Sequence, residues 1–170
     1  CYCYFHQYNV PTKSVRPSHT YGPGFREDDD RAYAQFTMNA VNNEDIVLQS
    51  DGSAKRSFLY IADAVRAYFT VLLSGKNGEV YNIANKREIS IKELAQIIIG
   101  ISGEICMKID TNAQNQSAKS THGLADITKI RELGWEPEIS EEEGFRRTIK
   151  FYKSRKEFTI TDDDYIWEDM

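Results

Sequence analysis

The fold is decided by one stretch of the sequence, 57-SFLYIADAVRAYFTVLLSGKNGEVYNI-83. It opens with a strand-like run of aromatic and branched residues. A helix follows, because apolar residues recur at the spacing of one helical face from Val65 to Leu72, and Gly75 stands where a helix commonly ends. A short apolar strand is then expected at 80–83. A strand, a helix and a second strand in this order are typical of α/β proteins.

The same alternation extends outward from this stretch. Two capping boxes, 90-SIKE-93 and 140-SEEE-143, predict the starts of two more helices, because the serine and the glutamate can each bind a free backbone N–H there. Further strands are expected at 12–16, 46–49 and 105–109, further helices at 2–8, 31–41 and 126–134, and a loop at 17–24. The predicted fold class is therefore α/β.

Asp51-Gly52 lies between two strand-like runs, 46–49 and 57–61. Asp-Gly is a favoured pair at the turn of a β-hairpin, because both residues tolerate a positive φ. The sequence therefore predicts that these two runs pair with each other as a hairpin.

The composition is that of one globular protein with its own core. Of 170 residues 41% are hydrophobic, and 21 Lys and Arg against 26 Asp and Glu give a net charge of −5 at pH 7. Nucleic acid is an unfavourable partner for a chain without a basic excess. No apolar run approaches the roughly 18 residues that a membrane-spanning helix needs. The cysteines and histidines form no set with the spacing of a metal site. The three cysteines are an odd number without the spacing of a disulfide framework, so we expect reduced thiols and a cytoplasmic protein.

The last residues differ in composition from the rest, and we assign 158–170 as an acidic tail after a body of residues 1–157. Five of the nine residues in 162–170 are acidic, and a triplet of large apolar residues, Tyr165-Ile166-Trp167, interrupts them. Such a segment is either a solvated tail or one that docks its aromatic side chains onto a partner subunit. The sequence leaves both alternatives open.

Three side chains are candidates for binding an anion. His19 closely follows a strand, and ligands of open α/β sheets usually bind at that end of the strands. Arg56 precedes a strand, where a rigidly held guanidinium suits a phosphate. Arg31 opens a helix, where a cation opposes the helix dipole and suggests that its guanidinium points at an anion elsewhere. The simpler alternatives are a structural histidine and a surface ion pair of Arg56 with Asp51 or Asp63.

The sequence contains no G-x-G-x-x-G, no P-loop, no nucleophile elbow and no H-E-x-x-H. Instead, four segments occur in a characteristic order. They are RPSHTYGPG at 16–24, DGSAKRSFLYIAD at 51–63, YNIAN at 81–85, and LGWEP at 133–137 followed by EGF at 143–145. This series resembles the C-terminal half of the NAD-dependent nucleotide-sugar epimerase/dehydratase family, the extended short-chain dehydrogenases. Asp29-Asp30-Arg31 is most similar to the UDP-glucuronate decarboxylase and dTDP-glucose 4,6-dehydratase branches.

The resemblance covers residues 1 to about 155 and implies the end of a Rossmann sheet interleaved with a small α/β substrate-binding lobe. In the family the Gly-rich NAD loop and the catalytic Tyr-x-x-x-Lys lie upstream of the matched part, so the N-terminal NAD-binding half is expected to be missing here. The resemblance therefore implies no catalytic residue in this chain and no activity of the chain alone. It implies a full-length parent that is a homodimeric, NAD-dependent isomerase or lyase acting on a nucleotide-diphosphate sugar.

The family also implies roles for particular residues. The cofactor-binding candidates, beside the nicotinamide of NAD, are Pro17 and Ser18. The substrate-binding candidates, beside the diphosphate, are His19, Arg31, Arg56 and Lys119. His19 replaces the asparagine that is usual in the family, and Lys119 stands in a segment that usually supplies a further arginine.

A second hypothesis is a non-catalytic module that binds a nucleotide in the same pocket or regulates a partner. A reading frame upstream of Cys1 that contains a Gly-rich loop and Tyr-x-x-x-Lys would favour the enzyme. A start codon near Cys1 would favour the module.

Overall fold

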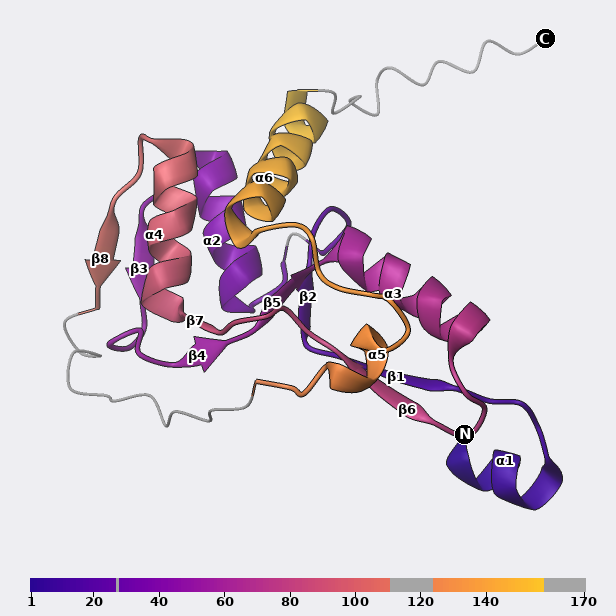
Figure 1. Cartoon of the computed structure of the whole chain (residues 1–170). Helices are drawn as coiled ribbons and strands as arrows, with labels where there is room; N and C mark the ends of the chain where they lie inside the picture. Colours follow the sequence, from indigo (N-terminus) through magenta and orange to yellow (C-terminus); the bar gives the residue numbers. More distant parts are fainter. Residues whose placement is uncertain (27, 111–123, 158–170) are drawn as a thin grey trace, which may run out of the picture.

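The computed structural model describes residues 1–26, 28–110 and 124–157. Within these ranges the strands are short and pair two by two, with three parallel pairs and one antiparallel pair. Helices connect and cover them (Figure 1). The α/β class predicted from the sequence is confirmed.

The decisive stretch forms the predicted strand–helix–strand unit. Strand β5 (Phe58–Tyr60) leads directly into helix α3 (Ile61–Ser74), which is followed by strand β6 (Val80–Ile83). β6 pairs in parallel with β1 (Ser14–Pro17), and β5 pairs in parallel with β2 (His19–Tyr21). The last residue of β1 and the first residue of β2 are only two positions apart, and all four strands contact α3.

The predicted loop at 17–24 is wrong in part, because it contains β2. In the ladder with β5, His19 lies opposite Phe58 and Tyr21 lies opposite Tyr60. A strand of three residues depends on its partner strand more than on local propensity. The Pro and Gly residues that predicted a loop stand at the ends of this strand and leave its middle free to pair.

The predicted hairpin is also wrong. Strand β3 (Ile46–Leu48) pairs in parallel with β8 (Met107–Ile109), whereas β5 pairs with β2. The turn between them exists, since Gly52 has a φ of 71° and the Ser53 N–H donates to Asp51 Oδ1 at 3.0 Å. It leads the chain into β4 (Lys55–Arg56), which pairs antiparallel with β7 (Ile89–Ser90). The sequence therefore predicted the turn correctly, but β3 and β5 each pair with a strand that is distant in the sequence.

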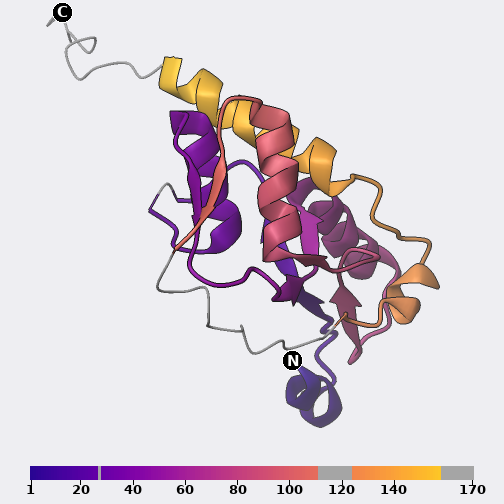
Figure 2. The same ribbon diagram turned by 90° about the vertical axis from the view of Figure 1, so that its left-hand side faces the viewer.

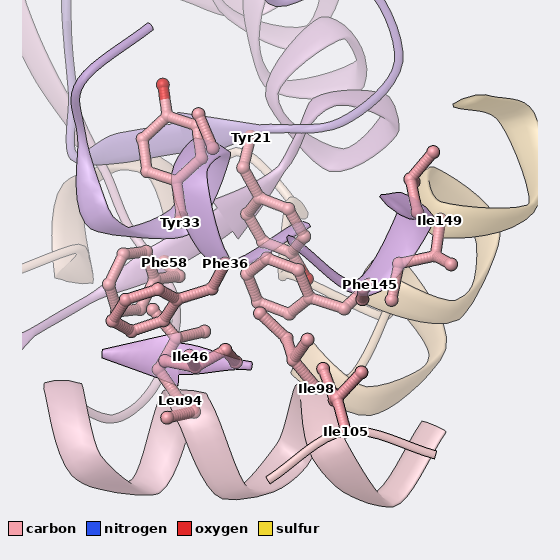
Figure 3. Packing of buried hydrophobic residues seen from close by; sticks show 14 of the residues in the cluster. Tyr21, Tyr33, Phe36, Ile46, Phe58, Leu94, Ile98, Ile105, Phe145 and Ile149 are labelled. Atoms are coloured by element: carbon pink, nitrogen blue, oxygen red, sulfur yellow. The ribbon is translucent and has the colours of Figure 1, made fainter. Parts of the chain in front are cut away.

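Three helices, α2 (Ala32–Asn42), α4 (Ile91–Ser102) and α6 (Glu141–Glu157), lie side by side in Figures 1 and 2. They bury a hydrophobic cluster against β2, β3 and β5, part of which is drawn in Figure 3. At its centre the ring of Tyr21 stacks on Phe145, with ring centroids 4.0 Å apart. The buried face predicted for the last helix is confirmed, because Phe145, Ile149 and Tyr152 are all buried.

Ser90 caps α4 as the capping box predicts, since its Oγ accepts a hydrogen bond from the Glu93 N–H at 3.0 Å. We expect Ser90→Ala to lower the free energy of unfolding by about 1 kcal/mol, because this N–H loses its partner. Urea unfolding followed by circular dichroism measures the loss. Ser90→Thr keeps a hydroxyl and is the matched control, and an alanine variant as stable as the threonine variant would contradict the role of the cap.

Helix α3 is confirmed, but its large apolar residues do not face the core. The four residues whose spacing predicted the helix, from Val65 to Leu72, are between 43% and 62% exposed. The buried side chains are mostly small, Ala64, Ala67 and Val71, in a second cluster with β6 and Trp135. A helix that lies close to strands needs small residues at the contact. The periodicity therefore located the helix without identifying its buried face.

Two short helices complete the described part. Helix α1 (Tyr2–Tyr8) has no buried residue, and α5 (Thr128–Arg131) begins after Asp126, whose Oδ1 accepts a hydrogen bond from the Thr128 N–H at 2.9 Å. Among the residues that the structure describes, no helix combines the length and the apolar character needed to cross a bilayer. The acidic tail assigned to 158–170 lies outside the described residues.

Candidate functional site

The predicted anion-binding residues His19, Arg31 and Arg56 line one cavity of about 170 Å³. They come from three different elements, namely β2, the residue before α2, and β4. The rest of the lining is mostly apolar or aromatic and consists of Ala32, Tyr33, Phe58 and Ile91. Three residues that are far apart in the sequence therefore meet at one place.

Strand geometry explains why His19 and Arg56 meet. His19 lies opposite Phe58 in the parallel ladder, and their rings are 5.9 Å apart between centroids. Arg56 precedes Phe58 by two residues, and side chains two apart in an extended chain point the same way. Phe58 therefore lies beside both the imidazole and the guanidinium and lines the cavity together with them. Sequence reasoning did not assign Phe58 to the site, although its spacing from Arg56 was visible in the sequence.

Arg31 is held by Asp29. The Arg31 Nε donates to Asp29 Oδ1 at 2.8 Å, and a second guanidinium nitrogen binds the other carboxylate oxygen. The guanidinium also lies 4.9 Å from the centroid of the Tyr33 ring, within cation–π range. The Arg31 side chain lowers the pKa of the Asp29 carboxyl and Asp29 raises the pKa of Arg31. Asp29 is thus the anion that pairs with Arg31 at this helix start. The sequence analysis expected an anion elsewhere and missed this neighbouring side chain.

The imidazole of His19 sits between positive charges. Burial lowers the pKa of His19 below its ordinary value of 6.5, and the charges of Arg56 and Arg31 lower it further. The side chain is therefore neutral at pH 7, with one ring nitrogen donating and the other accepting. A ligand that brings negative charge into the cavity would reverse this effect.

The ion-pair alternative for Arg56 fails for one of its two proposed partners. The buried Asp63 carboxylate binds Arg66 Nη1 through Oδ1 at 2.9 Å. Its Oδ2 accepts hydrogen bonds from the backbone N–H groups of Glu138 and Ile139, at 3.1 and 2.9 Å. Asp63 thus connects α3 to the segment before α6. Arg56 itself donates from Nη1 to the Lys55 carbonyl oxygen at 2.7 Å.

Pro17 and Ser18, the cofactor-binding candidates, lie at the end of β1 and not in the cavity. The Ser18 N–H donates to the Ile83 carbonyl oxygen at 2.9 Å, which fixes its backbone against β6. Its hydroxyl oxygen is buried and has no hydrogen-bond partner among the described residues. Burying a hydroxyl without a partner costs about 1–3 kcal/mol, so this group suits a contact with a further polar molecule or segment.

Lys119 lies outside the described residues, within 111–123. A Tyr-x-x-x-Lys spacing occurs inside α6 at Tyr152 and Lys156, and both side chains make structural contacts. The buried Tyr152 hydroxyl donates to the Phe25 carbonyl oxygen at 2.5 Å, and Lys156 binds the side chain of Asn42. This pair therefore fastens α6 to the segments beside it.

Comparisons with known proteins agree with the fold and the motifs. The model of the NAD-dependent epimerase/dehydratase family matches residues 1–84. Human dTDP-D-glucose 4,6-dehydratase is 33% identical over an alignment of 161 positions that covers 88% of this chain and 44% of that protein. UDP-glucuronic acid decarboxylase 1 of Xenopus tropicalis is 30% identical and is matched over 92% of this chain and 37% of its own length. The chain thus spans less than half the length of these curated relatives.

Solved structures give the same result. UDP-glucose 4-epimerase of Thermotoga maritima, solved with UDP-glucose, superposes with a TM-score of 0.76 at 26% identity, over 90% of this chain and 49% of that one. dTDP-glucose 4,6-dehydratase of Bacillus anthracis, solved with NAD, superposes with a TM-score of 0.72 at 26% identity, over 92% and 49%. The fold, the ordered motifs and these matches agree, and the chain belongs to the NAD-dependent epimerase/dehydratase family.

Proposed function

We propose that this chain supplies the nucleotide-sugar-binding portion of an NAD-dependent nucleotide-sugar epimerase, dehydratase or decarboxylase. The observation that carries the proposal is the convergence of His19, Arg31 and Arg56 on one cavity. The names of its relatives support it, since they act on UDP- or dTDP-linked sugars.

The cavity has the chemistry that a nucleotide diphosphate requires. A diphosphate diester carries two negative charges, and an arginine fork binds phosphate oxygens through two parallel hydrogen bonds. Arg56 provides one such group. Arg31, whose Nε and one Nη nitrogen bind Asp29, adds positive charge and its remaining N–H groups, and His19 adds a neutral donor. Phe58 and Ile91 offer an apolar wall. A cavity of about 170 Å³ suits the diphosphate alone, so the sugar and the nucleoside would extend out of it in opposite directions.

We propose that NAD is bound mainly by the half of the family fold that this chain does not cover. Pro17 and Ser18 suit the edge of the NAD site, because they stand at the carboxyl end of a parallel strand. The Ser18 hydroxyl is also buried without a partner among the described residues. Bound NAD supplies the hydride acceptor. Ser18 would then orient the neighbouring ring through its fixed backbone and its hydroxyl. The chain alone would bind substrate without turning it over.

The proposal extends to the setting of the full-length parent. We propose a cytoplasmic homodimer that is either a lyase or an isomerase and works without nucleic acid or membrane. A non-catalytic nucleotide-binding module is the alternative. Thermal unfolding with a UDP-sugar, with and without NAD, separates the two. A parent protein stabilised by both ligands supports the enzyme, and one stabilised by the nucleotide alone supports the module.

Arg56→Ala tests the site directly in this chain. We expect the affinity for UDP and dTDP to fall at least about fivefold, because a charge-assisted hydrogen bond to a phosphate is lost. Isothermal titration calorimetry gives both dissociation constants. Lys55→Ala is the matched control. It also removes one positive charge, but the Lys55 side chain, one residue before Arg56, does not line the cavity. Equal affinities of the two variants would refute the assignment.

A further inference from the structure

A groove of about 710 Å³ runs along α6 and shares no lining residue with the cavity at His19. Its apolar lining comes from Pro23, Tyr60 and Phe151. Phe151 is 39% exposed, although it stands on a helix whose other aromatic residues, Phe145 and Tyr152, are buried. An apolar groove of this size on a described surface is suited to receive another segment.

The polar lining of the groove is cationic and comes from α6. Arg147, Lys150 and Arg155 all border it. Arg147 is partly neutralised by Glu143, whose carboxylate lies 2.7 Å from its Nε. From Arg147 to Lys156 the helix carries five basic residues and no acidic one. The positive charge along α6 therefore increases toward the end of the helix at Glu157.

The matching negative charge occurs in the sequence directly after α6. Residues 158–170 contain five acidic residues and no basic one, so the other 21 acidic residues balance all 21 Lys and Arg of the chain. The whole formal net charge of −5 thus belongs to this segment. Acidic residues also flank its triplet Tyr165-Ile166-Trp167 on both sides. An apolar triplet between carboxylates is complementary to an apolar groove with a cationic border.

We propose that residues 162–170 bind in the groove along α6 of the same chain. The triplet Tyr165-Ile166-Trp167 contacts the aromatic lining, and the flanking carboxylates pair with Lys150 and Arg155. Both side chains stand on the C-terminal half of α6, which leads toward the tail.

The length of the connection permits binding within one chain. α6 ends at Glu157, so 158–161 provide four residues for a reversal of direction, which is enough for a turn. From Arg147 to Glu157 the helix rises about 15 Å at 1.5 Å per residue. The nine residues 162–170 span about 30 Å when extended, which is twice that distance. The tail can therefore run back along the whole groove.

Zero-length cross-linking of the full chain tests the proposal, because a carbodiimide joins a lysine to a carboxylate only where the two touch. Lys150 lines the groove and Lys153, on the same helix, does not. We expect peptides that join Lys150 to 162–170 to be at least fivefold more abundant than those that join Lys153 to it. Sodium chloride at high concentration should reduce this difference, since it screens the pairing. Equal yields at both lysines would overturn the proposal.

A mixture of ¹⁴N- and ¹⁵N-labelled chains identifies the occupant. Binding within one chain gives cross-linked peptides with a single label, and this is the expected result. Mixed-label peptides in the statistical proportion would instead show that the tail binds a second copy, which overturns binding within the chain.

Fluorescence of Trp167 gives an independent measurement. Trp135 is buried and supplies a constant background that a Trp167→Phe variant allows one to subtract. We expect Lys150→Glu to increase acrylamide quenching of Trp167 at least twofold, and the matched Lys153→Glu to leave it unchanged. Circular dichroism verifies that both variants are folded. Quenching of Trp167 that is the same in all three proteins would refute the proposal.

Discussion

Asp63→Asn should lower the free energy of unfolding by about 2–4 kcal/mol, since it leaves two buried hydrogen-bond donors or a guanidinium without an acceptor. Asp63 is 0% exposed and uses both carboxylate oxygens. One binds Arg66, and the other accepts the backbone N–H groups of Glu138 and Ile139. An asparagine has only one acceptor oxygen, and its NH₂ group would face donors in either orientation.

Urea unfolding of the full chain measures this loss. Glu138→Gln is the matched control, because Glu138 Oε1 binds the same guanidinium at 2.5 Å from a carboxylate that is 66% exposed. An exposed ion pair contributes at most about 1 kcal/mol, so the control should stay close to the parent protein. Equal losses in the two variants would show that Asp63 acts only as a partner of Arg66 and does not hold the segment before α6.

The affinity for UDP-glucose should rise about tenfold as the pH falls from 8 to 5, and His19→Asn should remove this dependence. In the free protein, burial and the charges of Arg56 and Arg31 lower the pKa of His19 below 6.5. A bound diphosphate adds two negative charges, which raise that pKa. Binding therefore takes up a proton wherever the pH lies between the free and the bound pKa, and each unit of difference is a factor of ten.

The choice of ligand isolates the histidine. Both phosphates of UDP-glucose are diesters, so the ligand keeps its charge across this pH range. Tyr33 and Asp29 also lie beside the site, but the pKa of Tyr33 is raised and that of Asp29 is lowered, so neither changes charge in this window. Calorimetry at several pH values should give a slope for the parent and none for the asparagine variant. Parallel curves would show that another group takes up the proton.

The same shift has a consequence for the free protein. Because the folded pKa of His19 is below its unfolded value, the unfolded chain binds more protons in the window between them. The contribution of His19 to stability is therefore lost as the pH falls through 6.5 toward the folded pKa. His19→Asn should remove this loss as well, and acid unfolding without a ligand measures it.

Local signals in the sequence determined the helices and their starts. Ser90 binds the N–H of a residue three positions away, and the Asp51-Gly52 turn forms between neighbours. The residues of these interactions are two or three positions apart in the chain, so the pattern alone identifies them. The ordered motifs likewise predicted the family without reference to the fold.

Strand partners were not determined in this way. β3 pairs with β8 and β5 pairs with β2, although the turn between β3 and β5 predicted that they pair with each other. Strands as short as these depend on their tertiary partners more than on local propensity. The buried face of α3 was also not determined by local signals. The side that contacts the strands carries small residues such as Ala64 and Ala67, and the large apolar residues are exposed.

The candidate site shows the same difference between local signals and tertiary contacts. By itself the sequence identified His19, Arg31 and Arg56 as side chains that could bind an anion, because their residue types and their positions beside strands and helices are local properties. Only the tertiary structure decided that they line one cavity, that Asp29 holds Arg31, and that Asp63 binds a segment more than seventy residues away. The physical reason is that the pairing of β2 with β5 and of β4 with β7 brings together groups whose separation along the chain carries no information about their distance in space.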